Sequence, residues 1–422
     1  MDAQEPKLAR LPSGLTLLTE RVPGRRPAVI GVWIGAGSAH DPPQRRGLAH
    51  FLEHMLFKGT PRRSGEQIDR LMARVGADLN GYADKEHTCF LARCLGEHVP
   101  LALDVLADMV LHSRLAAEDI EREKLVVAEE IAQYEDDPEQ VVDDLLAEVL
   151  WGDHPLSRTT LGQLECVQRL RRQDFLDFTS TYFTPANMVV AAAGDIEHEE
   201  LAAVAAQHFD VPAQDPPGRA LPRLEPRSGS QVIEREGSQA HICLGVRGCA
   251  RADDDLYAER IISIALGGGA ASRLFREVRE KKGLAYSVGS DANAHSCGGC
   301  VALFAGARPA AIPDIVAHFR QELADIAAHG LRPEELEETR EQLTARVELA
   351  LDDMGVRAEH LAESWLYHGR LLPVQEILDC LAKVSAQDVQ RVAHGMFADG
   401  PLALAALGPL AGINLEGYAC QL

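Results

Sequence analysis

Three residues near the N-terminus have the types and spacing of a zinc site, since His50, Glu53 and His54 form an H-x-x-E-H group. Residues four apart lie one above the other on a helix, so both imidazoles can present a ring nitrogen to one tetrahedral ion. Glu53 lies beside them, where it is better placed to take a proton from a metal-bound water than to coordinate the metal. The group therefore predicts the chemistry of a zinc hydrolase.

A chance occurrence on a solvated helix is the alternative, because only three of the five positions in the pattern are fixed. The surrounding residues are apolar, which predicts a largely buried helix, and buried imidazoles and carboxylates need partners. A metal ion would be one such partner. The apolar neighbours are Leu48, Phe51, Leu52, Met55, Leu56 and Phe57.

A third protein ligand must come from elsewhere, because a catalytic zinc ion takes three and leaves one position to water. The acidic and apolar helical pattern of residues 117–131 offers Glu123, Glu129 and Glu130. Glu123 and Glu130 are seven apart, which is two helical turns along one face. The residues alone do not choose among these three glutamates.

The combined pattern resembles the pitrilysin or insulinase family of zinc metallopeptidases, of the mitochondrial-processing-peptidase type and in particular its bacterial homodimeric members. In that family H-x-x-E-H is followed by a ligand glutamate that has another glutamate seven positions before it, as Glu130 has Glu123 here. The resemblance implies Glu130 as the third ligand and Glu123 as a supporting carboxylate. It also implies Glu53 as general base and one zinc ion per chain.

The segment 76–90 resembles the edge strand of the family, which pairs with the substrate backbone by β-augmentation. The resemblance implies that Asn80 contacts the substrate. Gly81 stands where relatives usually have alanine, and a glycine weakens the preference for a strand.

The segment 267–287 resembles a Gly-rich turn and helix that end in an arginine and tyrosine pair, Arg279 and Tyr286. In relatives this pair contacts the substrate carbonyl, where a cation and a phenol stabilise a developing oxyanion. The alternative is a surface arginine and a core tyrosine. A phosphate-binding loop is excluded, because the Gly-Lys-Ser/Thr ending is missing.

Composition narrows the function further. A formal net charge of −22 disfavours a surface for phosphate groups, so we expect no nucleic-acid partner. No apolar run reaches membrane length and no signal peptide is visible, which predicts a cytoplasmic protein without membrane contact, or a periplasmic one if a leader was removed. Nine scattered cysteines, with one C-x-x-C at Cys297 and Cys300, indicate reduced thiols.

The chain of 422 residues is too long for one ordinary core, and its proline-rich segment 211–230 reads as a linker. It separates a zinc-binding domain, 1–210, from a metal-free domain, 231–422, that carries the Arg279 and Tyr286 pair. The halves look duplicated, because the apolar runs that close at Gly194 and Gly408 are 214 residues apart.

The duplication offers an internal control. The positions of His50, Glu53 and His54 fall opposite residues that cannot bind a metal, and Glu130 falls opposite a cation. The residues opposite are Ile262, Ala265, Leu266 and Arg346.

The periodicities predict an α+β fold of two homologous domains, each a mainly antiparallel sheet with helices packed on one face. The resemblance implies that a second two-domain unit closes over the first, giving a homodimer whose chamber admits short or unfolded peptides. Arg279 and Tyr286 would then complete the zinc site of the facing subunit, or a related subunit would form a heterodimer. The alternatives are a non-catalytic scaffold or partner-dependent subunit, and a zinc hydrolase of small molecules, which the Asn80 strand disfavours.

Overall fold

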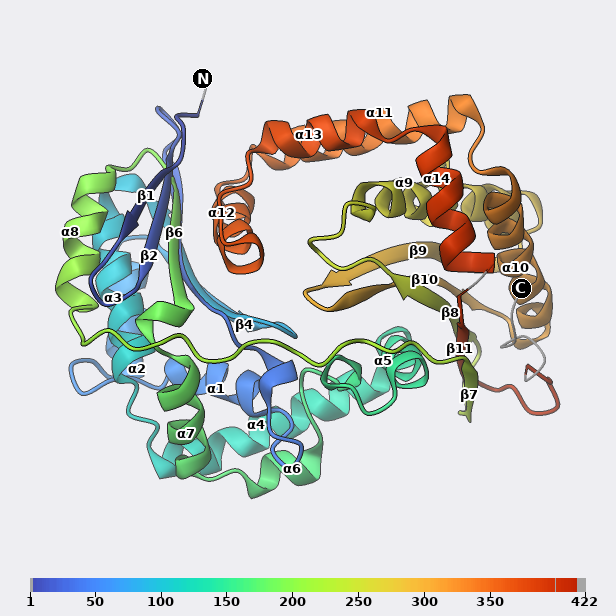
Figure 1. Cartoon of the computed structure of the whole chain (residues 1–422). Helices are drawn as coiled ribbons and strands as arrows, with labels where there is room; N and C mark the ends of the chain where they lie inside the picture. The colour runs from blue at the N-terminus through green and yellow to red at the C-terminus, as the bar shows by residue number, and fades with distance from the viewer. Residues whose placement is uncertain (1–2, 399, 416–422) are drawn as a thin grey trace. The chain divides into compact units, whose positions relative to one another are not determined.

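The computed structural model describes residues 3–398 and 400–415. The chain forms two compact units, and each of them combines one sheet with packed helices (Figure 1). The two-domain α+β class predicted from the sequence is therefore confirmed. The first unit comprises Met1–Ile131, Thr159–Arg219 and Leu349–Leu372, and the second comprises Ala132–Arg158, Ala220–Glu348 and Pro373–Leu422.

The first unit contains a six-stranded sheet in the order β1-β2-β6-β3-β5-β4. Every neighbouring pair is antiparallel except β2 and β6, which are parallel. The strand β4 lies at one edge, so one side of its backbone has no strand partner among the described residues. The strands are β1 Lys7–Arg10, β2 Thr16–Arg21, β3 Pro27–Ile34, β4 Asp78–Ala83, β5 Thr88–Leu95 and β6 Met188–Gly194.

Helices cover one face of this sheet and form the larger core, because alternate strand residues such as Ile30, Val32 and Val190 point toward them. The residues between these, such as Trp33 and Val189, point to the opposite face and pack against one helix, α12. The helices are α1 Leu48–Leu56, α2 Gly65–Arg74, α3 Val99–His112, α4 Ala117–Asp136, α6 Leu164–Arg169, α7 Arg172–Tyr182, α8 His198–His208 and α12 Met354–His368.

The second unit contains a five-stranded sheet in the order β7-β11-β8-β10-β9, in which only β7 and β11 are parallel. Its strands are β7 Gly229–Glu234, β8 Ala240–Gly248, β9 Ala285–His295, β10 Gly298–Ala307 and β11 Leu402–Gly408. Its helices are α5 Pro138–Trp151, α9 Leu256–Gly267, α10 Ile312–His329, α11 Pro333–Ala350, α13 Val374–Lys383 and α14 Ala386–Ala393, and a π-helical segment spans Phe275–Lys281. The remaining short helical segments of the chain are Ser38–His40, Gly96–His98, Pro155–Ser157, Pro185–Asn187, Pro309–Ala311 and His394–Ala398.

The two sheets repeat one topology, as the internal duplication predicts. The order β2-β6-β3-β5-β4 of the first unit matches β7-β11-β8-β10-β9 of the second, with the same parallel and antiparallel pairings. The strand β1 has no counterpart among the described strands of the second unit. A common origin of the two domains explains this shared order.

Two helices are exchanged between the halves of the sequence. The helix α5 packs on β8 and β11 of the second unit, and α12 packs on β3 and β6 of the first. Gly245 permits the close approach of α5, because a Cβ atom there would lie 2.8 Å from Leu146 Cδ2. The units therefore differ from the ranges 1–210 and 231–422 in two exchanged segments, since each apolar outer sheet face needs a helical cover.

Candidate metal and catalytic site

The helix α1 is fixed at its N-terminus by Asp41, which is buried. The carboxylate of Asp41 accepts hydrogen bonds from the backbone N–H groups of Gly47 (2.8 Å), Leu48 (3.0 Å) and Ala49 (3.0 Å). These are N–H groups that a helix leaves unsatisfied, and a negative charge is favourable at this end. Gly47 itself has φ 92°, a conformation that suits glycine. The helix is thereby held in one position.

The structure brings His50, His54 and Glu130 together. Each offers one donor atom, and the three atoms lie within 4.8 Å of one another. Glu130 Oε1 lies 3.6 Å from His50 Nε2, and Glu130 Oε2 lies 3.4 Å from His54 Nε2. Tetrahedral zinc with bonds of about 2.0 to 2.1 Å separates two ligand atoms by roughly 3.3 to 3.4 Å. The spacing of the donors therefore fits a zinc ion.

The hydrogen bonding of these side chains also fits a cation. Glu130 Oε2 is buried and has no hydrogen-bond partner among the described residues. Buried polar atoms are normally satisfied, and Glu130 presents one carboxylate oxygen to each histidine, so a cation between the three side chains would supply the missing partner. A site of two histidines and one carboxylate is a donor set that zinc enzymes use. Of the three glutamates left open by the sequence, the geometry selects Glu130.

Glu123 supports this cluster from behind. Its Oε1 atom lies 3.0 Å from His54 Nδ1, and its Oε2 atom lies 2.6 Å from Lys58 Nζ. An ionised carboxylate only accepts, so Nδ1–H of His54 donates and Nε2 keeps its lone pair for a metal. Such outer partners fix the tautomer and ring direction of metal-binding histidines. Glu129, by contrast, is exposed to solvent.

Glu53 lies at the side of the cluster, and its side chain is only 13% exposed. Its Oε2 atom is 3.8 Å from His54 Nε2. Burial raises the pKa of the Glu53 carboxyl above its ordinary value; the nearby His54 opposes this, and the charges of Glu130 and Glu123 add to it. A carboxyl group of raised pKa is suited to both accepting and returning a proton.

Asn80 is exposed on the edge strand β4, and its Oδ1 accepts a hydrogen bond of 2.9 Å from the N–H of Gly81. Gly81 faces helix α1, because a Cβ atom there would lie 2.8 Å from Glu53 Oε1. The departure from alanine at this position therefore leaves room directly beside Glu53. The edge strand and the candidate base are neighbours.

Arg279 and Tyr286 lie in the second unit and contact each other. The Arg279 guanidinium carbon is 5.4 Å from the centre of the Tyr286 ring and 4.8 Å from that of Phe275. Such cation–π contacts hold a guanidinium group in place. Tyr286 is 76% exposed, so it is not the core tyrosine of the alternative interpretation. Arg279 and Tyr286 therefore form one exposed pair in the second unit.

Comparison with known proteins identifies the family. A family model described as insulinase, peptidase family M16, matches residues 16–164, and one described as the peptidase M16 inactive domain matches residues 169–343. An uncharacterized zinc protease of Streptomyces coelicolor is 38% identical over 411 residues, covering 95% of this chain and 89% of the relative. The chain belongs to the insulinase family, M16. An uncharacterized zinc protease of Bacillus subtilis is 34% identical over 399 residues, covering 94% and 97%.

Solved structures share the fold of this chain. An M16 inactive-domain structure from Pseudomonas fluorescens has a TM-score of 0.89 at 21% identity and covers 96% of this chain and 98% of that one. A protease from Helicobacter pylori has a TM-score of 0.88 at 22% identity, with coverage of 96% and 99%. A chain of complex III from Candida albicans has a TM-score of 0.86 at 17% identity, with coverage of 98% of each. At these identities the likeness concerns the fold.

Sequence reasoning missed two residues near the cluster. Lys58 contacts Glu123, and Asp41 accepts hydrogen bonds from the N-terminus of α1. The signal for Lys58 was its place one helical turn beyond His54, next to an acidic helix. The signal for Asp41 was an acidic residue in the loop before the helix. Neither signal shows from sequence alone which partner the side chain meets.

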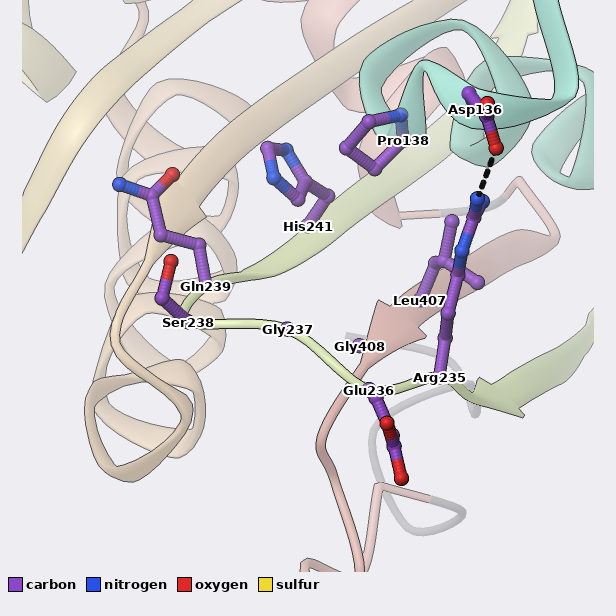
Figure 2. Close-up of a pocket in the computed structure, with 10 residues that line it drawn as sticks. All are labelled: Asp136, Pro138, Arg235, Glu236, Gly237, Ser238, Gln239, His241, Leu407 and Gly408. Atoms are coloured by element: carbon purple, nitrogen blue, oxygen red, sulfur yellow. Dashed lines mark hydrogen bonds and ion pairs between the residues drawn. The ribbon is translucent and has the colours of Figure 1, made fainter.

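The duplicated helix of the M16 inactive domain has no such cluster. On α9 the residues opposite the H-x-x-E-H group, Ile262, Ala265 and Leu266, are buried in the apolar core. The second unit instead has a cavity of about 300 Å³ whose lining includes His241 and an ion pair of 3.4 Å between Arg235 and Asp136 (Figure 2). The Asp136 side chain is mostly exposed, and such pairs contribute little free energy.

Among the helices of residues 3–398 and 400–415, none is both long enough and apolar enough to cross a bilayer.

Proposed function

We propose that this M16 chain is a zinc-dependent endopeptidase that hydrolyses short or unfolded peptides and binds one zinc ion through His50, His54 and Glu130. The observation that carries the proposal is the cluster of these three donors, with Glu53 beside it. The names of the relatives, which are zinc proteases, support the same chemistry.

The chemistry that zinc supplies in such a site is a lowered pKa of water and a polarised carbonyl group. Glu53 accepts the proton of the attacking water and later transfers it to the leaving amine. Glu123 holds the ring of His54 through the 3.0 Å contact with Nδ1. Asp41 keeps α1, and with it both histidines, in place.

The proposed substrate is a peptide in extended conformation. The strand β4 is the edge of its sheet, and its free backbone side offers N–H and C=O groups to an added strand. Main-chain pairing depends little on side chains, but it requires a segment without structure of its own. Asn80, exposed on this strand, is placed to contact the peptide.

We further propose that the active form is a homodimer with composite sites. Arg279 and Tyr286 would then act on substrate at the zinc site of the partner subunit, where a cation and a phenol stabilise negative charge. Their mutual stacking and the exposure of Tyr286 support a role on a surface that meets another molecule. Closed two-fold dimers are the commonest oligomers.

Mixing two inactive variants tests the composite site. Glu53→Gln and Arg279→Ala chains should each cleave poorly alone, and an equal mixture should recover about a quarter of the wild-type activity, since half the dimers are mixed and each has one intact site. Cleavage of a quenched peptide after subunit exchange measures this recovery. No recovery despite exchange demonstrated by native mass spectrometry would show that Arg279 does not act across subunits.

Metal removal tests the proposed function itself. The purified chain should cleave an unstructured, internally quenched peptide library, lose this activity to a chelator, and regain it when zinc is restored. A folded chain that holds zinc and cleaves no member of the library would refute a self-sufficient peptidase. A folded chain that takes up no zinc would favour the non-catalytic alternative.

A further inference from the structure

Lys58 follows the metal helix α1 and reaches the carboxylate that supports it. Lys58 Nζ lies 2.6 Å from Glu123 Oε2, and the other oxygen of Glu123 lies 3.0 Å from His54 Nδ1. We propose that Lys58 is a positioning residue of the metal centre, which acts through Glu123 to fix the direction of the His54 ring. The proposal rests on the proposed zinc function and adds a residue that the H-x-x-E-H group does not contain.

Because Glu123 is buried, its carboxylate needs the positive charge of Lys58 as a partner. The Glu123 side chain is 9% exposed, so its two oxygens depend on protein partners for the hydrogen bonds that water would supply. Lys58 and His54 are those partners, one on each oxygen. Removing one partner of a buried ion pair is costly, because the other charge is left uncompensated. Without Lys58, Glu123 would lose the contact that holds it against His54.

The backbone at Lys58 is held by hydrogen bonds, which fix the position of its Cα atom. The carbonyl oxygen of Lys58 accepts a hydrogen bond of 3.3 Å from Arg114 Nη2, and the carbonyl of Gly59 accepts one of 3.0 Å from the Arg114 N–H. The N–H of Lys58 donates to Met55 O at 3.2 Å, which continues the turn of α1. These bonds hold the position that the ammonium group needs.

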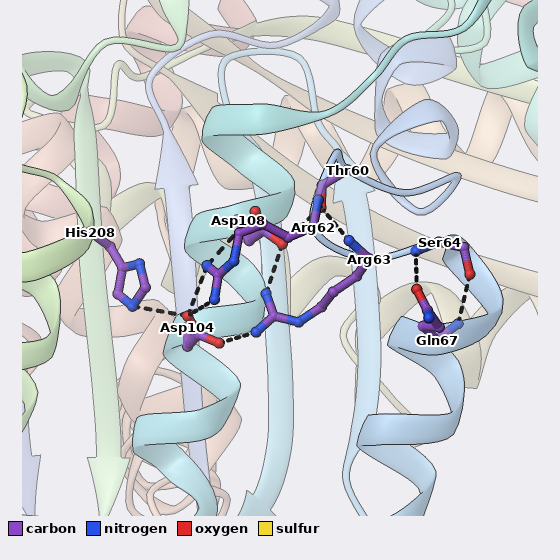
Figure 3. A network of polar contacts seen from close by, with 8 residues as sticks. All are labelled: Thr60, Arg62, Arg63, Ser64, Gln67, Asp104, Asp108 and His208. Carbon is purple, nitrogen blue, oxygen red and sulfur yellow. Dashed lines mark hydrogen bonds and ion pairs between the residues drawn. The ribbon is translucent and has the colours of Figure 1, made fainter.

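The next residues of the loop are tied to α3 (Figure 3). Thr60 Oγ1 donates to Asp108 Oδ2 at 2.8 Å, and Arg63 Nη1 donates to the same oxygen at 2.7 Å. Asp108 is 1% exposed, and Arg63 also pairs with Asp104. Buried, charge-assisted hydrogen bonds are the strong class of such bonds. These bonds tie the residues that directly follow Lys58 to helix α3.

A plain surface ion pair is the competing interpretation, because the Lys58 side chain is 36% exposed. Exposed pairs usually contribute little, and their loss would not alter a metal site. The chain supplies a matched example in Lys7, which pairs with the exposed Glu199 at 2.9 Å. The two interpretations differ in whether the Lys58 pair affects zinc affinity.

Zinc affinity, measured by competition with a chromophoric chelator, decides between them. Lys58→Met should weaken zinc binding about 10- to 100-fold, as is typical for outer partners of metal ligands, and Lys58→Gln should do the same. Lys58→Arg should keep zinc affinity within about threefold of wild type, because the side chain at this position remains positively charged. Lys7→Met should leave it unchanged. The visible spectrum of the cobalt-substituted protein should shift in Lys58→Met, since it reports ligand geometry.

A double-mutant cycle checks the route through Glu123. Glu123→Gln should weaken zinc binding, and adding Lys58→Met should cost little more, because both changes break one chain of contacts. Fully additive losses, or wild-type affinity in folded Lys58→Met and Lys58→Gln, would overturn the proposal while leaving the zinc function intact. A wild-type chain that binds no zinc would overturn both.

Discussion

Replacing Glu53 by glutamine is expected to lower kcat/KM for a peptide substrate by about 10² to 10⁴-fold, the usual contribution of a general acid–base group. Glutamine has the shape of glutamate but cannot accept the proton of the attacking water. Zinc affinity should stay within about threefold of wild type, because the proposed ligands are His50, His54 and Glu130 and not Glu53. Steady-state kinetics and a zinc titration on the same preparation measure both quantities.

A matched control for this variant is Glu66→Gln. Glu66 is an exposed residue of α2 that pairs with Arg70, so its loss should leave both kinetics and zinc affinity unchanged. Unaltered turnover in Glu53→Gln would remove the base assignment. Loss of zinc from Glu53→Gln would instead mean that Glu53 coordinates the metal, and a different residue would have to accept the proton.

The cluster of His50, Glu53 and His54 could be predicted because its spacing is set within one helix, where residues four apart necessarily lie on one side. Glu130 required tertiary information, since three glutamates on the same acidic segment fit the pattern equally well. The resemblance to the family chose Glu130, and in the structure Glu130 lies next to His50 and His54.

That the two sheets share one strand order was within reach of the sequence, because the halves look duplicated and each must bury a similar apolar pattern. The exchange of α5 and α12 was not. Both helices follow amphipathic patterns that would suit either sheet, and the proline-rich segment marks only one crossing between the halves. Sequence patterns show that a helix has an apolar face but not which sheet receives it.

The Lys58 contact was missed for a related reason. A lysine just after the end of a helix is usually solvated, and only the position of α4 reveals that a buried carboxylate lies within reach of Lys58. The same applies to Gly81. The reason for a glycine at this position appears only when the Glu53 carboxylate is seen beside it. Sequence thus located the proposed metal ligands better than the groups that contact them.

The second large effect is expected from Glu130→Gln, which should weaken zinc binding by more than about 100-fold, beyond the range for outer partners. An amide is a poorer ligand than a carboxylate and brings no negative charge to the site. Peptide cleavage at ordinary zinc concentrations should fall in parallel and recover in part with excess zinc. Competition titration and kinetics at several zinc concentrations measure these effects.

The three glutamates of α4 allow the expected losses of zinc affinity to be ranked. Glu130→Gln should weaken zinc binding most, Glu123→Gln about 10- to 100-fold, and the exposed Glu129→Gln not at all, because only Glu130 faces both His50 and His54. All three changes remove one charge from the same helix, so a general electrostatic effect would lower affinity equally in each. Equal losses, or a larger loss from Glu129→Gln than from Glu130→Gln, would contradict the ligand set. The order of these affinity losses therefore distinguishes direct coordination by Glu130 from a general effect of the negative charge on α4.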